Sequence, residues 1–72
     1  MSSQSESNIV MADALTLILH NQHALAAAVE EVTKWLSDNG IQSVADSALA
    51  AMETLDTNAQ AITDAITRLR KF

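Results

Sequence analysis

The sequence predicts an all-α protein: an antiparallel two-helix hairpin that self-associates into a four-helix bundle. Apolar residues recur at alternating steps of three and four along two long segments, which keeps one face of a helix apolar. The only glycine, Gly40, separates these segments, and the chain has no proline. The apolar fraction is 49%, more than the single contact between two helices can bury, so we expect a further partner surface.

The first helix should follow a flexible polar tail over residues 1–7, so that the hairpin domain covers residues 8–72. Ser7 or Asn8 can cap this helix, which should run from about Ile9 to Asp38. Its main apolar stripe is Met11, Leu15, Ile18, Gln22, Leu25, Val29, Val32 and Leu36.

Gly40 marks the end of the first helix. If Gly40 adopts the left-handed conformation, Leu36 and Ile41 occupy the two positions that form the hydrophobic contact of a Schellman motif. Ser43 should then cap the second helix, with Asp46 completing a capping box. That helix should run over about residues 44–71. Its main stripe is Ala45, Ala48, Met52, Leu55, Ala59, Ile62, Ile66 and Leu69.

A connection of about four residues forces the two helices to be antiparallel neighbours. The positions that face each other should therefore sum to about 80. The expected pairs are Leu36 with Ala45, Val29 with Met52, Leu25 with Leu55, Ile18 with Ile62, and Leu15 with Ile66.

A second apolar column on the first helix indicates where a partner binds. This column lies beside the main stripe, and Asn21 and Glu31 interrupt it. The apolar sector is then too wide for one partner helix, so one side should face a second subunit. Trp35 is either a packing residue there or an anchor for another protein. The predicted interface residues are Val10, Ala14, Leu17, Ala24, Ala28 and Trp35.

Three polar residues lie near the middle of the expected hairpin. Gln22 interrupts the main stripe and Asn21 interrupts the second column, and both should approach Asn58. A polar cluster inside a helical bundle can fix register and oligomeric state. The alternative is a partly solvated edge.

The charge distribution argues against several functions. Formal net charge is −5, and residues 1–67 hold nine acids but one base, Lys34. An acidic surface repels phosphate backbones, so we do not expect nucleic-acid binding. The basic residues Arg68, Arg70 and Lys71 fit a helix C-terminus, close to Glu6 and Asp13 in the hairpin. No segment is long enough to span a membrane, and the absence of cysteine fits a cytoplasmic location.

We find no catalytic constellation and expect neither an enzyme nor a bound cofactor. His20 and His23 could share a helix face as a metal-ligating pair does. They lie on the polar stripe, however, so we expect a solvated or interface pair rather than a metal site. Binding of a small molecule or metal between subunits, through His20, His23, Arg68 or Arg70, is the alternative function.

The predicted architecture resembles that of the Rop-type dimeric hairpins, which bind RNA, but no motif matches and the basic stripe needed for RNA is missing. The segments HNQHALAAAVEEVTKWL and VADSALAAMETLDTNAQAITDAI are similar to small uncharacterised bacterial helical proteins. We therefore expect a small non-enzymatic protein-interaction module, a regulator, adaptor or inhibitor of bacterial or phage type. Its expected partners are a second copy of itself, as a homodimer, and another protein.

Overall fold

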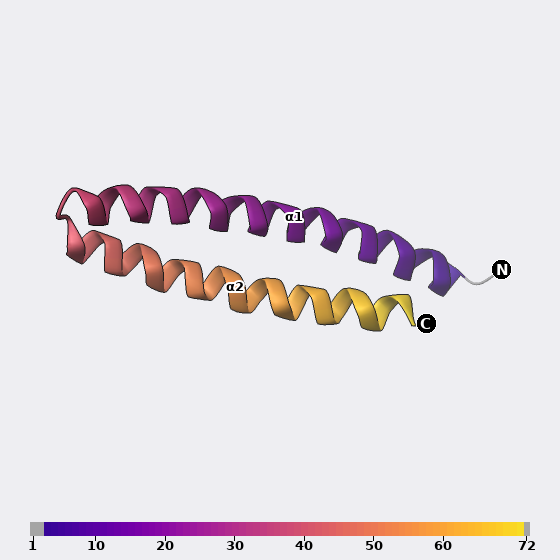
Figure 1. Cartoon of the computed structure of the whole chain (residues 1–72). Coiled ribbons are helices and arrows are strands. Elements are labelled where there is room, and N and C mark those ends of the chain that lie inside the picture. The colour runs from indigo at the N-terminus through magenta and orange to yellow at the C-terminus, as the bar shows by residue number, and fades with distance from the viewer. Residues whose placement is uncertain (1–2, 72) are drawn as a thin grey trace.

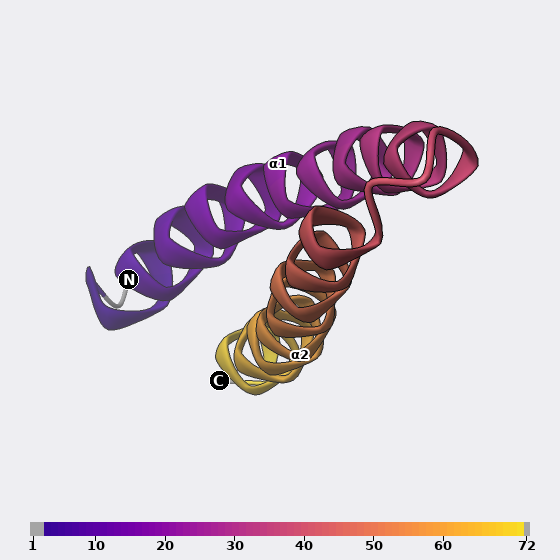
Figure 2. The same ribbon diagram turned by 90° about the vertical axis from the view of Figure 1, so that its left-hand side faces the viewer.

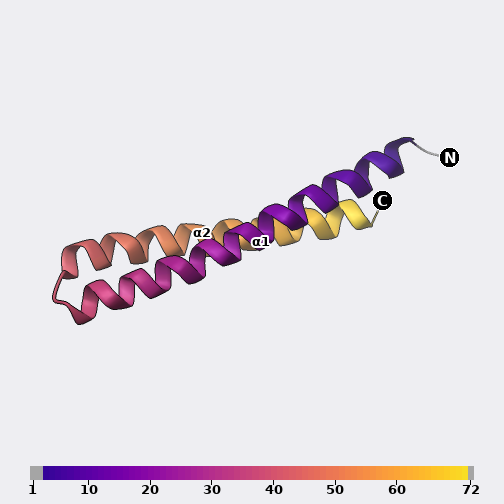
Figure 3. The same ribbon diagram turned by 90° about the horizontal axis from the view of Figure 1, so that it is seen from above.

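The computed structural model describes residues 3–71 and consists of two helices, α1 (Ser3–Asp38) and α2 (Gln42–Arg70). They run antiparallel and side by side (Figure 1). The molecule is a rod of 59 × 14 × 11 Å, in which the helices cross at a shallow angle (Figure 3). Viewed from the turn, the helices form a single layer that no other described segment covers (Figure 2). The predicted all-α hairpin is confirmed.

Gly40 forms the turn as predicted. Its φ is 75°, a left-handed conformation that costs glycine little. The Ile41 N–H donates to the Leu36 carbonyl at 2.9 Å, and the Gly40 N–H donates to the Ser37 carbonyl at 3.1 Å. These two bonds define a Schellman motif and satisfy carbonyls that the end of α1 would otherwise leave free.

The predicted start of the first helix is wrong, because α1 begins at Ser3 rather than at Ile9. Ser7 and Asn8 therefore lie within the helix and do not cap it. Asn8 is buried, and its Oδ1 accepts a hydrogen bond from Gln4 Nε2 at 3.2 Å. No glycine or proline in this segment stops the helix. Of the expected polar tail, residues 3–7 belong to α1, and residues 1–2 lie outside the described residues.

The predicted capping box at the start of α2 is also wrong. Ile41 occupies the cap position without a side-chain hydrogen bond, and Ser43 already lies inside the helix. Gln42 instead donates from Nε2 to Asp46 Oδ1 at 2.9 Å, while its Oε1 accepts from Ser37 Oγ at 3.3 Å. The turn thus joins the two helices through side chains, with Gln42 between them.

The helices meet along one line of residues that we call the hairpin seam. On α2 the seam residues are all buried or half-buried and form the predicted main stripe, Ala45 to Leu69. On α1 half of the predicted stripe is correct. The α1 seam consists of Asn8, Ala12, Leu15, Leu19, Gln22, Ala26, Val29, Thr33 and Leu36.

Four residues predicted for the α1 stripe lie outside the seam. Met11, Ile18, Leu25 and Val32 are 45%, 46%, 54% and 56% exposed. Ala12, Leu19, Ala26 and Thr33, each one position later, take their place. Because three of these side chains are small, the two helix axes can approach closely.

The register follows the predicted spacing even though the α1 face is rotated. Val29 and Val32 line one groove with Ala51 and Ala48, so facing positions again sum to about 80, as antiparallel neighbours require. Leu25 and Ile18 stand beside the seam rather than within it.

The core of this hairpin is thin. Ala12 and Ala45 are fully buried, but no large side chain is fully buried among the described residues. Thr33 is buried, and its Oγ1 donates to the Val29 carbonyl at 2.7 Å, which satisfies the hydroxyl and leaves the methyl group for the hairpin seam. One hairpin therefore gains little stability from burial alone.

Replacing Gly40 tests the turn. No atom lies within 4 Å of a Cβ built at this position, so Gly40→Ala adds only the backbone cost of a left-handed alanine. We expect a loss of about 1–2 kcal/mol in the free energy of unfolding, measured by urea denaturation at a fixed protein concentration. Gly40→Asn is the control and should lose less, because asparagine tolerates this conformation. Equal losses in the two variants would contradict this account of the turn.

Candidate functional site

A second seam runs along α1 and has no partner in the hairpin. Its residues follow each other at alternating steps of three and four, as in a helix-packing seam, and all of them are exposed. Trp35, at one end, is 60% exposed. We call this set the bare seam: Met11, Ala14, Ile18, Asn21, Leu25, Ala28, Val32 and Trp35.

Helix α2 carries a matching row on the same side of the molecule. Its members have the same spacing, and all are exposed except the half-buried Ala65. Most of these side chains are small, so they project less far from α2 than the large side chains of the bare seam project from α1. We call this set the small seam: Val44, Ser47, Ala51, Thr54, Asn58, Ala61, Ala65 and Arg68.

A shallow groove shows that the two rows share one face. Its volume is about 280 Å³, and every residue that lines it is apolar. Leu25, Ala28 and Val32 of the bare seam form one wall together with Val29, and Ala48 and Ala51 of α2 form the other. An apolar surface of this kind, along two long helices, is typical of a helix-packing site.

Charge separates this face from the rest of the hairpin. None of the nine acidic residues belongs to either seam, and Arg68 is the single charged residue among the sixteen. On α2, Asp46, Glu53 and Asp56 each follow a hairpin-seam residue by one position, whereas each small-seam residue precedes one. These acids thus lie on the side opposite to the small seam. One side of the rod is therefore free of acidic residues, whereas the opposite, acidic side carries several of them.

The predicted interface residues fall into two groups. Ala14, Ala28 and Trp35 belong to the bare seam. Val10, Leu17 and Ala24 are also exposed, but each precedes a bare-seam residue by one position and so lies about 100° further round the helix.

The sequence prediction missed Met11, Ile18, Leu25 and Val32 as exposed site residues, because it assigned them to the hairpin. A signal was present in the alanines beside them. Ala12 and Ala26 lie one position later and offer the small surface that close packing against α2 requires.

The three residues predicted to set the register differ in burial. Gln22 lies half-buried in the hairpin seam, while Asn21 and Asn58 are exposed in the bare seam and the small seam. Within residues 3–71, no hydrogen bond joins these three amide side chains. Gln22 thus remains the candidate for an effect on hairpin register, and the two asparagines belong to the exposed face.

His20 and His23 are exposed on α1. Each lies outside the bare seam, and no group of three or more histidine, cysteine, aspartate or glutamate residues that could hold a metal ion occurs in the described part of the chain. Neither described helix combines the length and apolar character needed to cross a membrane.

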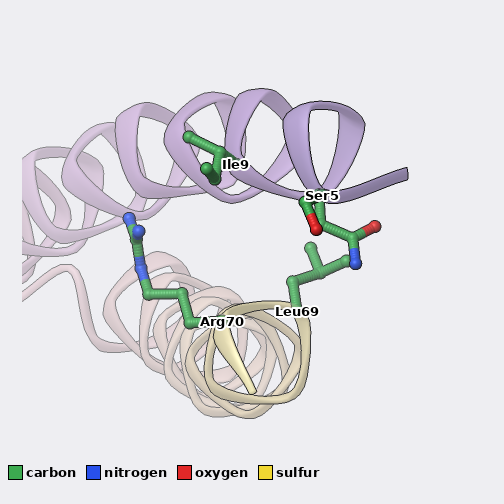
Figure 4. A pocket seen from close by; sticks show the side chains of 5 residues that line it. Ser5, Ile9, Leu69 and Arg70 are labelled. Atoms are coloured by element: carbon green, nitrogen blue, oxygen red, sulfur yellow. The ribbon is translucent and has the colours of Figure 1, made fainter. Parts of the chain in front are cut away.

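At the open end of the hairpin, Arg70 Nη2 lies 3.3 Å from Asp13 Oδ1. This contact confirms that the basic C-terminal turn approaches Asp13. Both side chains are at least half exposed, so the ion pair contributes little stability. Beside it, an open hollow of about 480 Å³ is lined by Ser5, Asn8, Ile9, Leu69 and Arg70 (Figure 4).

Comparison of the chain with protein families, with characterised proteins and with solved structures finds no significant match.

Gln22→Leu tests the role of the polar residue in the hairpin seam. The leucine should raise the unfolding midpoint, since it replaces a half-buried amide by an apolar side chain, and should allow more than one helix alignment. Alignment is measured as the distance distribution between spin labels on the two helices. Gln60→Leu, an exposed amide on the opposite, acidic side, is the control. A single, unchanged alignment and an unchanged particle mass in Gln22→Leu would rule out the register role.

Proposed function

We propose that this protein is a small non-enzymatic protein-interaction module that works as a homo-oligomeric helical bundle, most simply a dimer. The observation that carries the proposal is the bare seam, a row of large apolar side chains between Met11 and Trp35 that are 45–60% exposed. Such a row along a whole helix costs free energy in water unless another surface covers it.

The total surface area supports the same proposal. The hairpin exposes 5147 Å², whereas a compact monomer of this mass exposes about 4,300 Å². Two hairpins that together had the surface of an ordinary protein of twice the mass would bury about 3,100 Å² in total. This area falls within the range of obligate homodimers.

A regulator, adaptor or inhibitor also needs a surface for its target. Val10 and Leu17 are each 66% exposed and, with Ala24, form a column about 100° beyond the bare seam. This column stays available when a second helix covers the bare seam. We propose it as the contact for a larger protein, with a role of bacterial or phage type and a cytoplasmic location.

Particle mass tests the self-association. Light scattering at micromolar concentration should give twice the mass of the chain. Ile18→Lys should give a monomer with reduced helix content, because it places a charge in the bare seam. Leu49→Lys is the matched control: Leu49 is 42% exposed and lies on the opposite face, so its variant should remain dimeric. A monomeric wild-type protein at high micromolar concentration would refute self-association.

Partner capture tests the second contact. Immobilised wild-type protein and Leu49→Lys should retain the same protein from a bacterial lysate, whereas Leu17→Lys should lose it while keeping its dimeric mass. Retention of that protein by Leu17→Lys at the wild-type level would contradict the assignment of this column.

A further inference from the structure

We infer that the bare seam is covered by the bare seam of a second copy running in the opposite direction, with a two-fold axis between Asn21 and Leu25. This inference rests on the proposed self-association and specifies which surfaces meet. It places α1 against the partner's α1, α2 against the partner's α2, and the two turns at opposite ends of the bundle.

The order of large and small residues in the bare seam carries the inference. Large side chains alternate with small or polar ones from Met11 to Val32, and Trp35 ends the row. When this row is paired with its own reverse, every large residue from Ile18 to Val32 faces a small or polar one. Ile18 then faces the partner's Ala28, Leu25 the partner's Asn21, and Val32 the partner's Ala14. Large-into-small packing of this kind fills space without forcing the helices apart.

The ends of the row also pair. Trp35 faces the partner's Met11, and a thioether beside an aromatic ring is a favourable contact. These contacts lie at the two ends of the interface, where crossing helices separate and leave room for two large side chains.

The same axis pairs the small seam of α2 with its reverse. The bare seam is centred at about position 23 and the small seam at about position 56. Facing positions of this antiparallel hairpin sum to about 80, and the two centre positions do so as well. Both centres therefore lie at nearly the same height along the rod. Ala51 then faces the partner's Ala61, and Ser47 faces the partner's Ala65. One rotation therefore satisfies both helices.

The charge distribution supports opposite orientation. The open half of the hairpin is balanced, since Arg68, Arg70 and Lys71 lie at the same end as Glu6, Asp13 and Asp64, whereas the half toward the turn holds the other six acids and only Lys34. With the turns at opposite ends, the acidic half of each hairpin lies beside the balanced half of the other rather than beside a second acidic half. Such an arrangement favours this orientation over its alternatives, and no acid of either seam opposes it.

Site-specific cross-linking distinguishes this dimer from others, since the chain has no cysteine of its own. An Ala14→Cys chain is mixed with a size-tagged Val32→Cys chain and treated with a short bismaleimide. Positions 14 and 32 face each other in the inferred dimer, whereas two copies of position 14 are about 27 Å apart at 1.5 Å per residue. The mixed product should exceed each self-product at least about tenfold, as expected when the dimer holds one pair together.

Two further chains complete the experiment. If α1 packed against the partner's α2, Ala14→Cys would react with Ala65→Cys instead of Val32→Cys. That result would overturn the inference. Leu49→Cys, on the acidic face, is the control and should react with none of them. Light scattering of each mixture separates the two proposals. A monomer refutes self-association itself, whereas a dimer without the 14–32 product refutes this arrangement alone.

Discussion

Two helices can share only one line of contact, and the rest of this structure depends on which residues α1 places on that line. The helix has apolar residues on more of its circumference than a single neighbour can cover. Whichever column faces α2, another remains in water. In the structure, α1 places Ala12, Ala26 and Thr33 against α2 and leaves Met11, Ile18 and Leu25 exposed. That choice creates both the close hairpin and the exposed face.

The small residues of the hairpin seam limit the stability that one hairpin gains from burial. Alanine and threonine allow close approach but bury little apolar area, and the fully buried apolar residues described in the hairpin are two alanines. The bare seam instead leaves five large apolar side chains, from Met11 to Trp35, exposed and available for burial. In the proposed bundle, folding and association are therefore coupled, and stability depends on protein concentration.

The acidic residues are separated from the exposed apolar side chains of the bare seam. All nine acids lie outside the bare seam and the small seam, so the opposite side can stay hydrated when the apolar side is covered. In the proposed bundle, the acidic sides would keep separate dimers apart by like-charge repulsion.

The sequence alone determined the two helices, the turn at Gly40 and the seam of α2, because each follows from local rules: a seven-residue repeat, one left-handed glycine and the absence of proline. It could not determine the face of α1. Two apolar columns one residue apart, one through Ile18 and one through Leu19, share Leu15 and Val29 and satisfy the same periodicity. It also placed the helix starts too late, since capping residues such as Ser7 and Ser43 are compatible with a helix interior. Only the tertiary structure decided between the columns, because closeness of approach to α2 depends on the size of the side chains on both helices at once.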